Sequence, residues 1–150
     1  MTRSFAITTI LPVDSETVWN RALTMEGVNA ELWPWIRMTH PAGMDSLASP
    51  DIELGKPLFR SGLLLLGFLP VEYDDITLAE LGPGNRFLER SPMLTMKTWQ
   101  HERTVEEVEG GCRVTDRLTF ESRIPGATPL AAFLVLAVFR HRHRRLKGLY

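Results

Sequence analysis

Apolar and polar positions alternate along most of the chain and merge into one continuous apolar run only near its end. The first segment, Arg3 to Leu11, alternates and is rich in Thr, Ile and Phe, which predicts a strand. After it, Asp14 or Ser15 can cap a short helix over Glu16 to Leu23. The chain is therefore expected to open with a strand and a helix.

A second short helix is predicted over Asn29 to Ile36. Gly27 separates it from the first helix, because glycine is a poor helix former. The segment holds Trp33 and Trp35, and Pro34 interrupts it. We expect this helix to lie across one end of the sheet that follows.

The middle of the chain predicts strands separated by turns. A short strand at Arg37 to His40 is followed by a loop from His40 to Lys56, which contains prolines and glycines. Further strands are predicted at Leu58 to Leu66, Val71 to Leu81, Arg86 to Ser91, Lys97 to Val108 and Cys112 to Ser122. A glycine pair joins the last two strands as a hairpin.

Thr128 to Tyr150 predicts one long C-terminal helix. Thr128 can cap its first free amides, and Pro129 suits its first position. The apolar run from Pro129 to Phe139 is about half of the roughly 20 residues that a membrane span requires, so we reject a transmembrane helix. A stripe at helical spacing is expected to face the core, namely Ala132, Val135, Leu136, Phe139, Leu146 and Tyr150.

The outer side of this helix is also apolar. Leu130, Phe133 and Leu134 lie there, and a single sheet would leave them outside. Because large exposed apolar groups usually have a partner, we expect something to cover them. The two candidates are a second copy of the chain, as in a homodimer, and the segment with Trp33 and Trp35.

Basic residues concentrate at the end of the same helix. The last eleven residues hold 5 of the 17 basic residues and none of the 18 acidic ones, while the whole chain carries a net charge of -1. We interpret them as residues that solvate the helix end and complement its dipole, namely Arg140, Arg142, Arg144, Arg145 and Lys147. A weak contact with an anionic membrane surface is the alternative, and the acidic remainder of the chain disfavours nucleic acid as a partner.

Length and cysteine content indicate one domain, residues 1–150, whose core needs no disulfide or metal. Cys112 is the single cysteine and no signal peptide is visible, so a cytoplasmic location is expected. His141 and His143 lie about 200° apart around a helix and cannot converge on one metal ion. We expect neither a metal nor another cofactor.

Polar residues interrupt the apolar faces of two neighbouring strands. In Cys112 to Ser122 the even positions are apolar except for Asp116. In Lys97 to Val108 the inner face carries His101 and Arg103. Because a carboxylate buried alone is very costly, Asp116 is expected to have a partner among these residues.

The hairpin turn decides which residue lies opposite Asp116. A turn at Glu109-Gly110 places Arg103 there, whereas a turn at Gly110-Gly111 places Val105 there. We favour the first register, because a guanidinium can bind a carboxylate through two hydrogen bonds.

Three segments resemble a known superfamily: Leu11 to Trp19 (LPVDSETVW), Trp99 to Arg103 (WQHER) and Asp116 to Phe120 (DRLTF). With the order strand, two helices, strand meander and long helix, they are similar to the START-like superfamily (SRPBCC) of polyketide cyclases, dehydratases and lipid-transport proteins. The resemblance implies an α+β helix-grip fold, in which a curved antiparallel sheet of about six to seven strands surrounds the C-terminal helix. It also implies an internal cavity that holds an apolar molecule.

This resemblance makes the binding or transport of a small hydrophobic or aromatic ligand the leading function. The expected ligand-binding residues are Trp35, Tyr73, Trp99, His101, Arg103, Asp116, Leu118, Phe120, Val135 and Phe139. One alternative is a cyclase-like or dehydratase-like enzyme that uses His101 and Asp116 for acid-base chemistry. Another is that these residues and Arg103 form only a structural ion-pair cluster.

Leu63 to Pro70 is apolar on both strand faces. Its outer residues are expected to lie under the short helices, against a partner chain, or at a mouth through which a ligand enters. A third functional hypothesis is therefore association, through this segment or through the outer side of the last helix.

The next predicted strand contains two adjacent aspartates, Asp74 and Asp75. Apolar residues occupy odd positions before this pair and even positions after it, which predicts a β-bulge. We interpret both aspartates as solvated residues, with a polar group at the cavity rim as the alternative.

Overall fold

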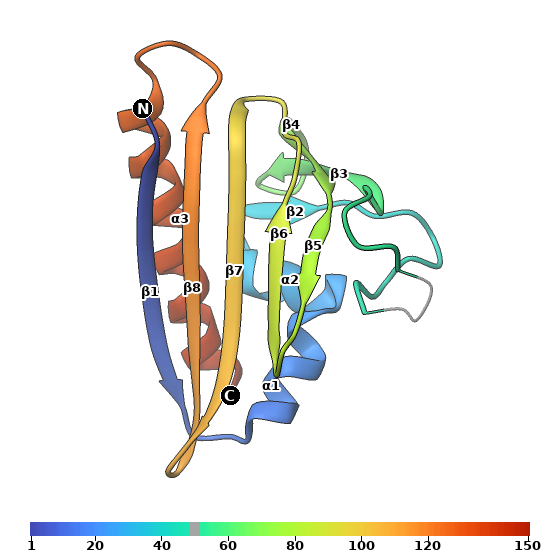
Figure 1. Ribbon diagram of the computed structural model, residues 1–150, viewed down its shortest axis with the longest axis vertical. Helices are drawn as coiled ribbons and strands as arrows, with labels where there is room; N and C mark the ends of the chain where they lie inside the picture. The colour runs from blue at the N-terminus through green and yellow to red at the C-terminus, as the bar shows by residue number, and fades with distance from the viewer. Residues whose placement is uncertain (49–51) are drawn as a thin grey trace.

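The protein packs a long C-terminal helix, α3, across antiparallel strands, as the computed structural model in Figure 1 shows. The structure describes residues 1–48 and 52–150, so residues 49–51 of the predicted loop lie outside the described part. The elements are β1 (Arg3–Leu11), α1 (Ser15–Ala22), α2 (Met25–Leu32), β2 (Ile36–Met38), β3 (Phe59–Leu65), β4 (Leu69–Ile76), β5 (Leu78–Leu81), β6 (Arg86–Arg90), β7 (Met96–Val108), β8 (Gly111–Ser122) and α3 (Thr128–Leu149). This order confirms the predicted α+β class.

The strands form two antiparallel sheets with the orders β1-β8-β7-β6-β5 and β2-β3-β4. The chain passes from the second sheet to the first at Thr77, between β4 and β5. The segment predicted as one strand, Val71 to Leu81, is therefore two strands. Its register shifts lie at Val71, where β4 has one residue more than β3, and at Ala79, where β5 has one residue more than β6. The prediction of a bulge at Asp74 and Asp75 is wrong.

The hairpin of β7 and β8 has the register that the sequence favoured. Arg103 lies opposite Asp116, and Val108 lies opposite Gly111, so Glu109 and Gly110 form the turn. The φ angle of Gly110 is 82°, a left-handed conformation that favours glycine in such a turn. The register with Val105 opposite Asp116 is wrong.

The second helix begins at Met25 rather than at Asn29, and its predicted start is wrong. Thr24 caps it, since its Oγ1 accepts a hydrogen bond from the Gly27 amide at 3.0 Å. Gly27 lies inside α2 and does not break it. A Cβ at this position would be 2.0 Å from the carbonyl oxygen of Arg21, so the glycine allows α1 and α2 to approach each other closely.

The long helix begins where the sequence predicted but is capped differently. Its N-cap is Ala127, which makes no side-chain hydrogen bond, and Pro129 lies in the first turn as expected. Thr128 does not cap the helix. Its Oγ1 accepts a hydrogen bond from the Ser122 amide at 3.2 Å, which ties the start of α3 to the end of β8.

The inner face of α3 combines apolar and charged residues. Val135, Phe139 and Leu146 are buried as predicted, and the rest of the predicted stripe is half-buried, namely Ala132, Leu136 and Tyr150. Arg142 and His143 are buried as well. The interpretation of Arg142 as a solvated residue of the helix end is therefore wrong, because Glu31 of α2 binds it inside the protein.

Leu130, Phe133 and Leu134 form an exposed apolar group on α3, which we call the outer patch. Phe133 is 70% exposed. The segment with Trp33 and Trp35 leaves the patch uncovered, and both indole rings are themselves exposed, so the prediction that this segment covers it is wrong. That a second copy of the chain covers the outer patch stays a prediction.

The connection between β3 and β4 is also apolar at the surface. Leu65, Leu66, Phe68 and Leu69 are exposed, so the short helices do not cover the outer residues of Leu63 to Pro70.

Most of the buried apolar residues in the described part of the chain fall into three groups. One group lies near the start of β8 and contains Leu11, Val18, Val105, Cys112, Val114 and Leu146. The others contain Leu23, Met25, Leu47, Ile76, Leu78 and Phe87, and Met93, Met96, Leu118, Phe120, Val135 and Phe139. Among the described residues, no helix is both long and apolar enough to cross a membrane.

Candidate functional site

A cavity of about 260 Å³ lies between α2, α3 and the inner faces of the strands. This volume is close to the lower end of the range for small-molecule sites, about 300 to 1,000 Å³. Most of the wall is apolar, formed by Ala22, Met25, Val28, Leu32, Ile36, Met38, Leu47, Leu63, Val71, Ile76, Leu78, Phe87, Met93, Met96, Trp99, Leu134, Val135, Val138 and Phe139. Such a lining suits an apolar guest.

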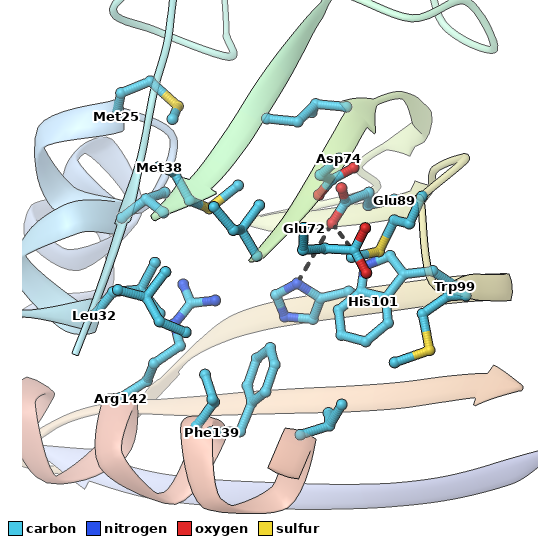
Figure 2. Close-up of a pocket in the computed structure, with 18 of the residues that line it drawn as sticks. Met25, Leu32, Met38, Glu72, Asp74, Glu89, Trp99, His101, Phe139 and Arg142 are labelled. Carbon is cyan, nitrogen blue, oxygen red and sulfur yellow. Dashed lines mark hydrogen bonds and ion pairs between the residues drawn. The ribbon is translucent and has the colours of Figure 1, made fainter. Parts of the chain in front are cut away.

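Five polar residues complete the lining: Glu72, Asp74, Glu89, His101 and Arg142. Figure 2 shows that the first four gather on one side, whereas Arg142 reaches the cavity from α3. Asp74 comes from β4, Glu89 from β6 and His101 from β7. We call these three residues the polar wall.

His101 is held in one orientation by contacts on several sides. Its Nε2 is 2.7 Å from Oδ1 of Asp116, and its Nδ1 is 3.8 Å from Oε1 of Glu89. The edge-to-face neighbours of its ring are Phe87, at 5.2 Å between centroids, and Phe139, at 4.9 Å. The imidazole therefore lies at the cavity surface between two carboxyl groups.

Asp116 lies behind His101 and is completely buried. Arg103 donates to both of its oxygens, from Nε and from Nη2, at 2.8 Å each. The Nε2 atom of His143 on α3 is 2.7 Å from Oδ2, and the other ring nitrogen of His143 is 2.7 Å from the hydroxyl of Thr9. Both oxygens of Asp116 thus have two partners each.

Glu31 extends this buried cluster to α2. Arg103 donates to its two oxygens at 2.8 and 2.7 Å, and the Nε of Arg142 donates to Oε1 at 3.1 Å. The cluster links α2, β7, β8 and α3. A structural role for Arg103 and Asp116 is therefore supported directly by their contacts.

Charge and hydrogen bonding decide the protonation of the buried acids. Burial alone would raise the pKa of Asp116, but the charges of Arg103 and His101 and their hydrogen bonds lower it well below its usual range. Burial would likewise raise the pKa of Glu31, which the charges of Arg103 and Arg142 lower instead. Both groups are therefore carboxylates, and Asp116 accepts its hydrogen bond from His101.

Asp74 and Glu89 carry opposite pKa shifts. Burial and then the charge of Glu89 raise the pKa of Asp74 well above its usual range. Burial would also raise the pKa of Glu89, but its interactions with the neighbouring side chains of His101 and Asp74 lower it. This pair therefore shares one proton, which resides on Asp74.

Glu72 has a supporting role at the edge of the cavity. Its carboxylate accepts hydrogen bonds from the backbone amides of Leu94, at 2.7 Å, and Thr95, at 3.1 Å. The Thr95 hydroxyl also donates to it. These contacts fix the segment between β6 and β7.

Four of the residues that the sequence predicted as ligand-binding line the cavity, namely Trp99, His101, Val135 and Phe139. The ring of Trp99 lies beside those of Phe120 and Phe139, and its Nε1 is 3.4 Å from Oε1 of Glu89. Contact of these residues with a ligand stays a prediction.

The other predicted ligand-binding residues do not line the cavity: Trp35, Tyr73, Arg103, Asp116, Leu118 and Phe120. Arg103 and Asp116 lie one layer deeper, within the ion-pair cluster. Trp35 is 54% exposed. Tyr73 carries Arg60 over its ring, with the guanidinium carbon 3.9 Å from the centroid.

Several polar residues of this region were missed by the sequence interpretation: Glu31, Asp74, Glu89, Arg142 and His143. Strand pairing offers a signal for Glu89, which lies opposite His101 and therefore shares its face. The chain between β6 and β7 contains no two-residue turn that fixes this register. Asp74 was interpreted as solvated, but it is buried, and only Asp75 lies near the surface, paired with Arg60.

Comparisons with known proteins agree with this architecture. Residues 9–150 match the model of a family described as "Domain of unknown function (DUF8410)". None of the curated proteins matches the chain.

Among the similar solved structures, three match over almost their entire length. The Zhui aromatase/cyclase from Streptomyces sp. R1128 has a TM-score of 0.72 and 12% identity, covering 99% of this chain and 93% of that one. A START superfamily protein from Mycobacterium smegmatis has a TM-score of 0.64 and 10% identity, and the match covers 98% of this chain and 94% of that one. Ginseng major latex-like protein 151 from Panax ginseng has a TM-score of 0.64 and 10% identity, and the match covers 99% of this chain and 97% of that one.

These likenesses define the class of protein: the chain has the START-like helix-grip fold that the sequence motifs predicted. Within this class, it belongs to the DUF8410 family, because the family match covers nearly the whole chain.

Proposed function

We propose that the protein binds a small, largely apolar molecule in the cavity between the sheet and α3. The observation that carries this proposal is the composition of the wall, which is apolar except for a few polar residues that are mostly collected on one side. Ligand sites commonly combine an apolar lining with few placed polar groups, which orient the guest. The proposal requires no cofactor, and a cytoplasmic location remains a prediction from the sequence.

The fold supports this proposal in a general way. A similar solved structure is named as an aromatase/cyclase and another as a START superfamily protein. We infer from them only that this architecture is compatible with enclosing a small molecule.

A substitution that fills the cavity tests the proposal. Val138 lines the cavity, whereas Ala137, the preceding residue of α3, is exposed. We expect Val138→Trp to weaken the binding of naphthalene by at least about tenfold, since the indole would occupy the space. The matched control Ala137→Trp should bind as the unaltered chain does.

Fluorescence titration would measure naphthalene binding, and native mass spectrometry of the purified protein would show any retained molecule. Two results together would overturn the proposal: no retained molecule, and no naphthalene binding by the unaltered chain. If the folded Val138→Trp variant binds naphthalene as well as the control does, naphthalene binds outside this cavity.

An enzymatic function is the second candidate. The observation that favours it is His101, which reaches the cavity while Asp116 holds its Nε2 from behind. His101→Gln retains a donor for Asp116 but cannot transfer a proton. On a substrate identified from a retained molecule, we expect this variant to keep binding and lose turnover, and unchanged turnover would exclude the enzyme.

A further inference from the structure

The polar wall contains a buried oxygen without a partner. Asp74 is only 5% exposed and lines the cavity, and its Oδ1 has no hydrogen bond within the described part of the chain. Its carboxyl group lies beside that of Glu89 (Figure 2). Because an unpaired buried acceptor is costly, a ligand that donates a hydrogen bond here would gain affinity.

We propose that the polar wall recognises a hydroxyl group, and that the ligand is an uncharged, mainly apolar alcohol or phenol whose O–H donates to the carboxyl group of Asp74. This inference rests on the proposed function, because it concerns the same cavity. It adds the chemical class of the ligand and the group that selects it.

The surroundings of Asp74 explain why the ligand should be a donor. Acidic groups face it from β4 (Glu72) and β6 (Glu89), and His101 lies beyond Glu89 on β7. The pKa of Asp74 is raised by its burial and by the neighbouring carboxylate of Glu89, so its carboxyl group keeps a proton. A protonated carboxyl group has one hydroxyl and one carbonyl-type oxygen, and the carbonyl-type oxygen can only accept.

Glu89 is a poorer target for the ligand than Asp74. Its Oε2 accepts a hydrogen bond from the Ser91 hydroxyl at 2.7 Å. Its Oε1 faces Nε1 of Trp99 at 3.4 Å and the His101 ring at 3.8 Å. The remaining acceptor capacity of the polar wall is therefore concentrated on Asp74.

A cationic ligand is the main competing class. An ammonium group would need Asp74 to ionise beside Glu89, and it would lose its own hydration in an otherwise apolar cavity. A hydroxyl group needs neither change. The observations therefore favour a neutral donor.

Three probes of similar shape separate these classes in the unaltered chain: 1-naphthol, naphthalene and 1-naphthylmethylamine. We expect 1-naphthol to bind about tenfold more tightly than naphthalene, which corresponds to about 1.4 kcal/mol, and the amine to bind most weakly. Without the hydrogen bond, the more apolar naphthalene would bind at least as well as 1-naphthol. This comparison needs no variant to fold.

Two substitutions then assign the preference to Asp74. Asp74→Asn keeps a neutral acceptor and can donate to Glu89, so it should retain the preference for 1-naphthol. Asp74→Leu has a similar shape but no acceptor, so it should abolish the preference while still binding naphthalene. Asp75→Asn, one position along β4, is the matched control and should behave as the unaltered chain.

The outcomes distinguish this inference from the proposed function. If naphthalene binds and 1-naphthol has no advantage, the inference is overturned and the proposed function stands. If the amine binds most tightly and Asp74→Asn removes its binding, the wall recognises a cation and the inference is overturned. If none of the three probes binds, both fail.

Discussion

Asp116 and Asp74 are both buried carboxyl groups, but their neighbours give them opposite protonation states. Asp116 is surrounded by Arg103, His101 and His143, and its pKa lies well below the usual range. Asp74 lies beside the carboxylate of Glu89, and its pKa lies well above that range. Stability due to Asp116 is therefore present above the unfolded-state pKa of about 3.9 and is lost as pH falls through its folded-state pKa.

Asp74 should have the opposite effect on the pH dependence of stability. Its folded-state pKa is raised, so its contribution is full below about pH 3.9 and is lost as pH rises through the folded-state value. Asn is neutral throughout this range. We therefore expect the free energy of unfolding of Asp74→Asn, relative to the unaltered chain, to increase between about pH 4 and about pH 8.

Urea unfolding at both pH values would measure this difference. Asp75→Asn is the control, because Asp75 is nearer the surface and its pKa is lowered by the hydrogen bond from Arg60. Equal pH profiles for Asp74→Asn and the unaltered chain would show that Asp74 is ionised in the folded protein.

Part of this residue chemistry could be predicted from the sequence. Strand alternation and the turn at Glu109-Gly110 were enough to place Arg103 opposite Asp116, because both are local properties of one hairpin. Glu31 and His143 come from helices that are distant in the sequence. The spacing of apolar residues shows which face of such a helix is buried. It does not show which residues of another element this face contacts.

At the scale of elements, α2 and α3 are joined by polar contacts around the apolar cavity. Besides the ion pair with Glu31, Nε of Arg145 donates to the Ala30 carbonyl at 3.0 Å. Nε2 of His141 is 2.7 Å from the Trp33 carbonyl oxygen. These contacts of α3 with α2 and with the residue that follows it position α2, and with it the cavity wall that α2 contributes.

Arg142 should make the largest contribution of these contacts to stability. Arg142→Met would keep an apolar stem but remove a charged donor from buried Glu31, so we expect a loss of about 1 to 3 kcal/mol in the free energy of unfolding. Arg144→Met, on the exposed side of the same helix, should change it by less than about 0.5 kcal/mol. Equal effects in chemical denaturation would mean that the ion pair adds no net stability.

The elements that the sequence misplaced have specific physical causes. Gly27 was taken as a helix breaker, although it is required by the close approach of α1. The division of β4 from β5 lies at Thr77, whose amide donates to the Ser91 hydroxyl at 3.0 Å. Both features depend on contacts with another segment, which composition and alternation do not encode.

At the scale of the whole molecule, the cavity and the exposed apolar surface meet on α3. Leu134 belongs to the outer patch and also lines the cavity. Leu63 lines it from β3, close to the exposed connection that follows. A partner that covered the outer patch would therefore also lie beside the cavity, so association and ligand binding are expected to affect each other.

The last prediction is that a second copy of the chain covers the outer patch. Phe133 is the most exposed of its three residues, and burying a Phe side chain is worth about 1.5 to 3 kcal/mol. We expect light scattering to show a dimer that Phe133→Ser converts to a monomer, while Arg144→Ser, about three turns further along the exposed side of α3, leaves the dimer intact. An unaltered chain that stays monomeric as its concentration rises would contradict this association, and the outer patch would then remain open to solvent beside the cavity.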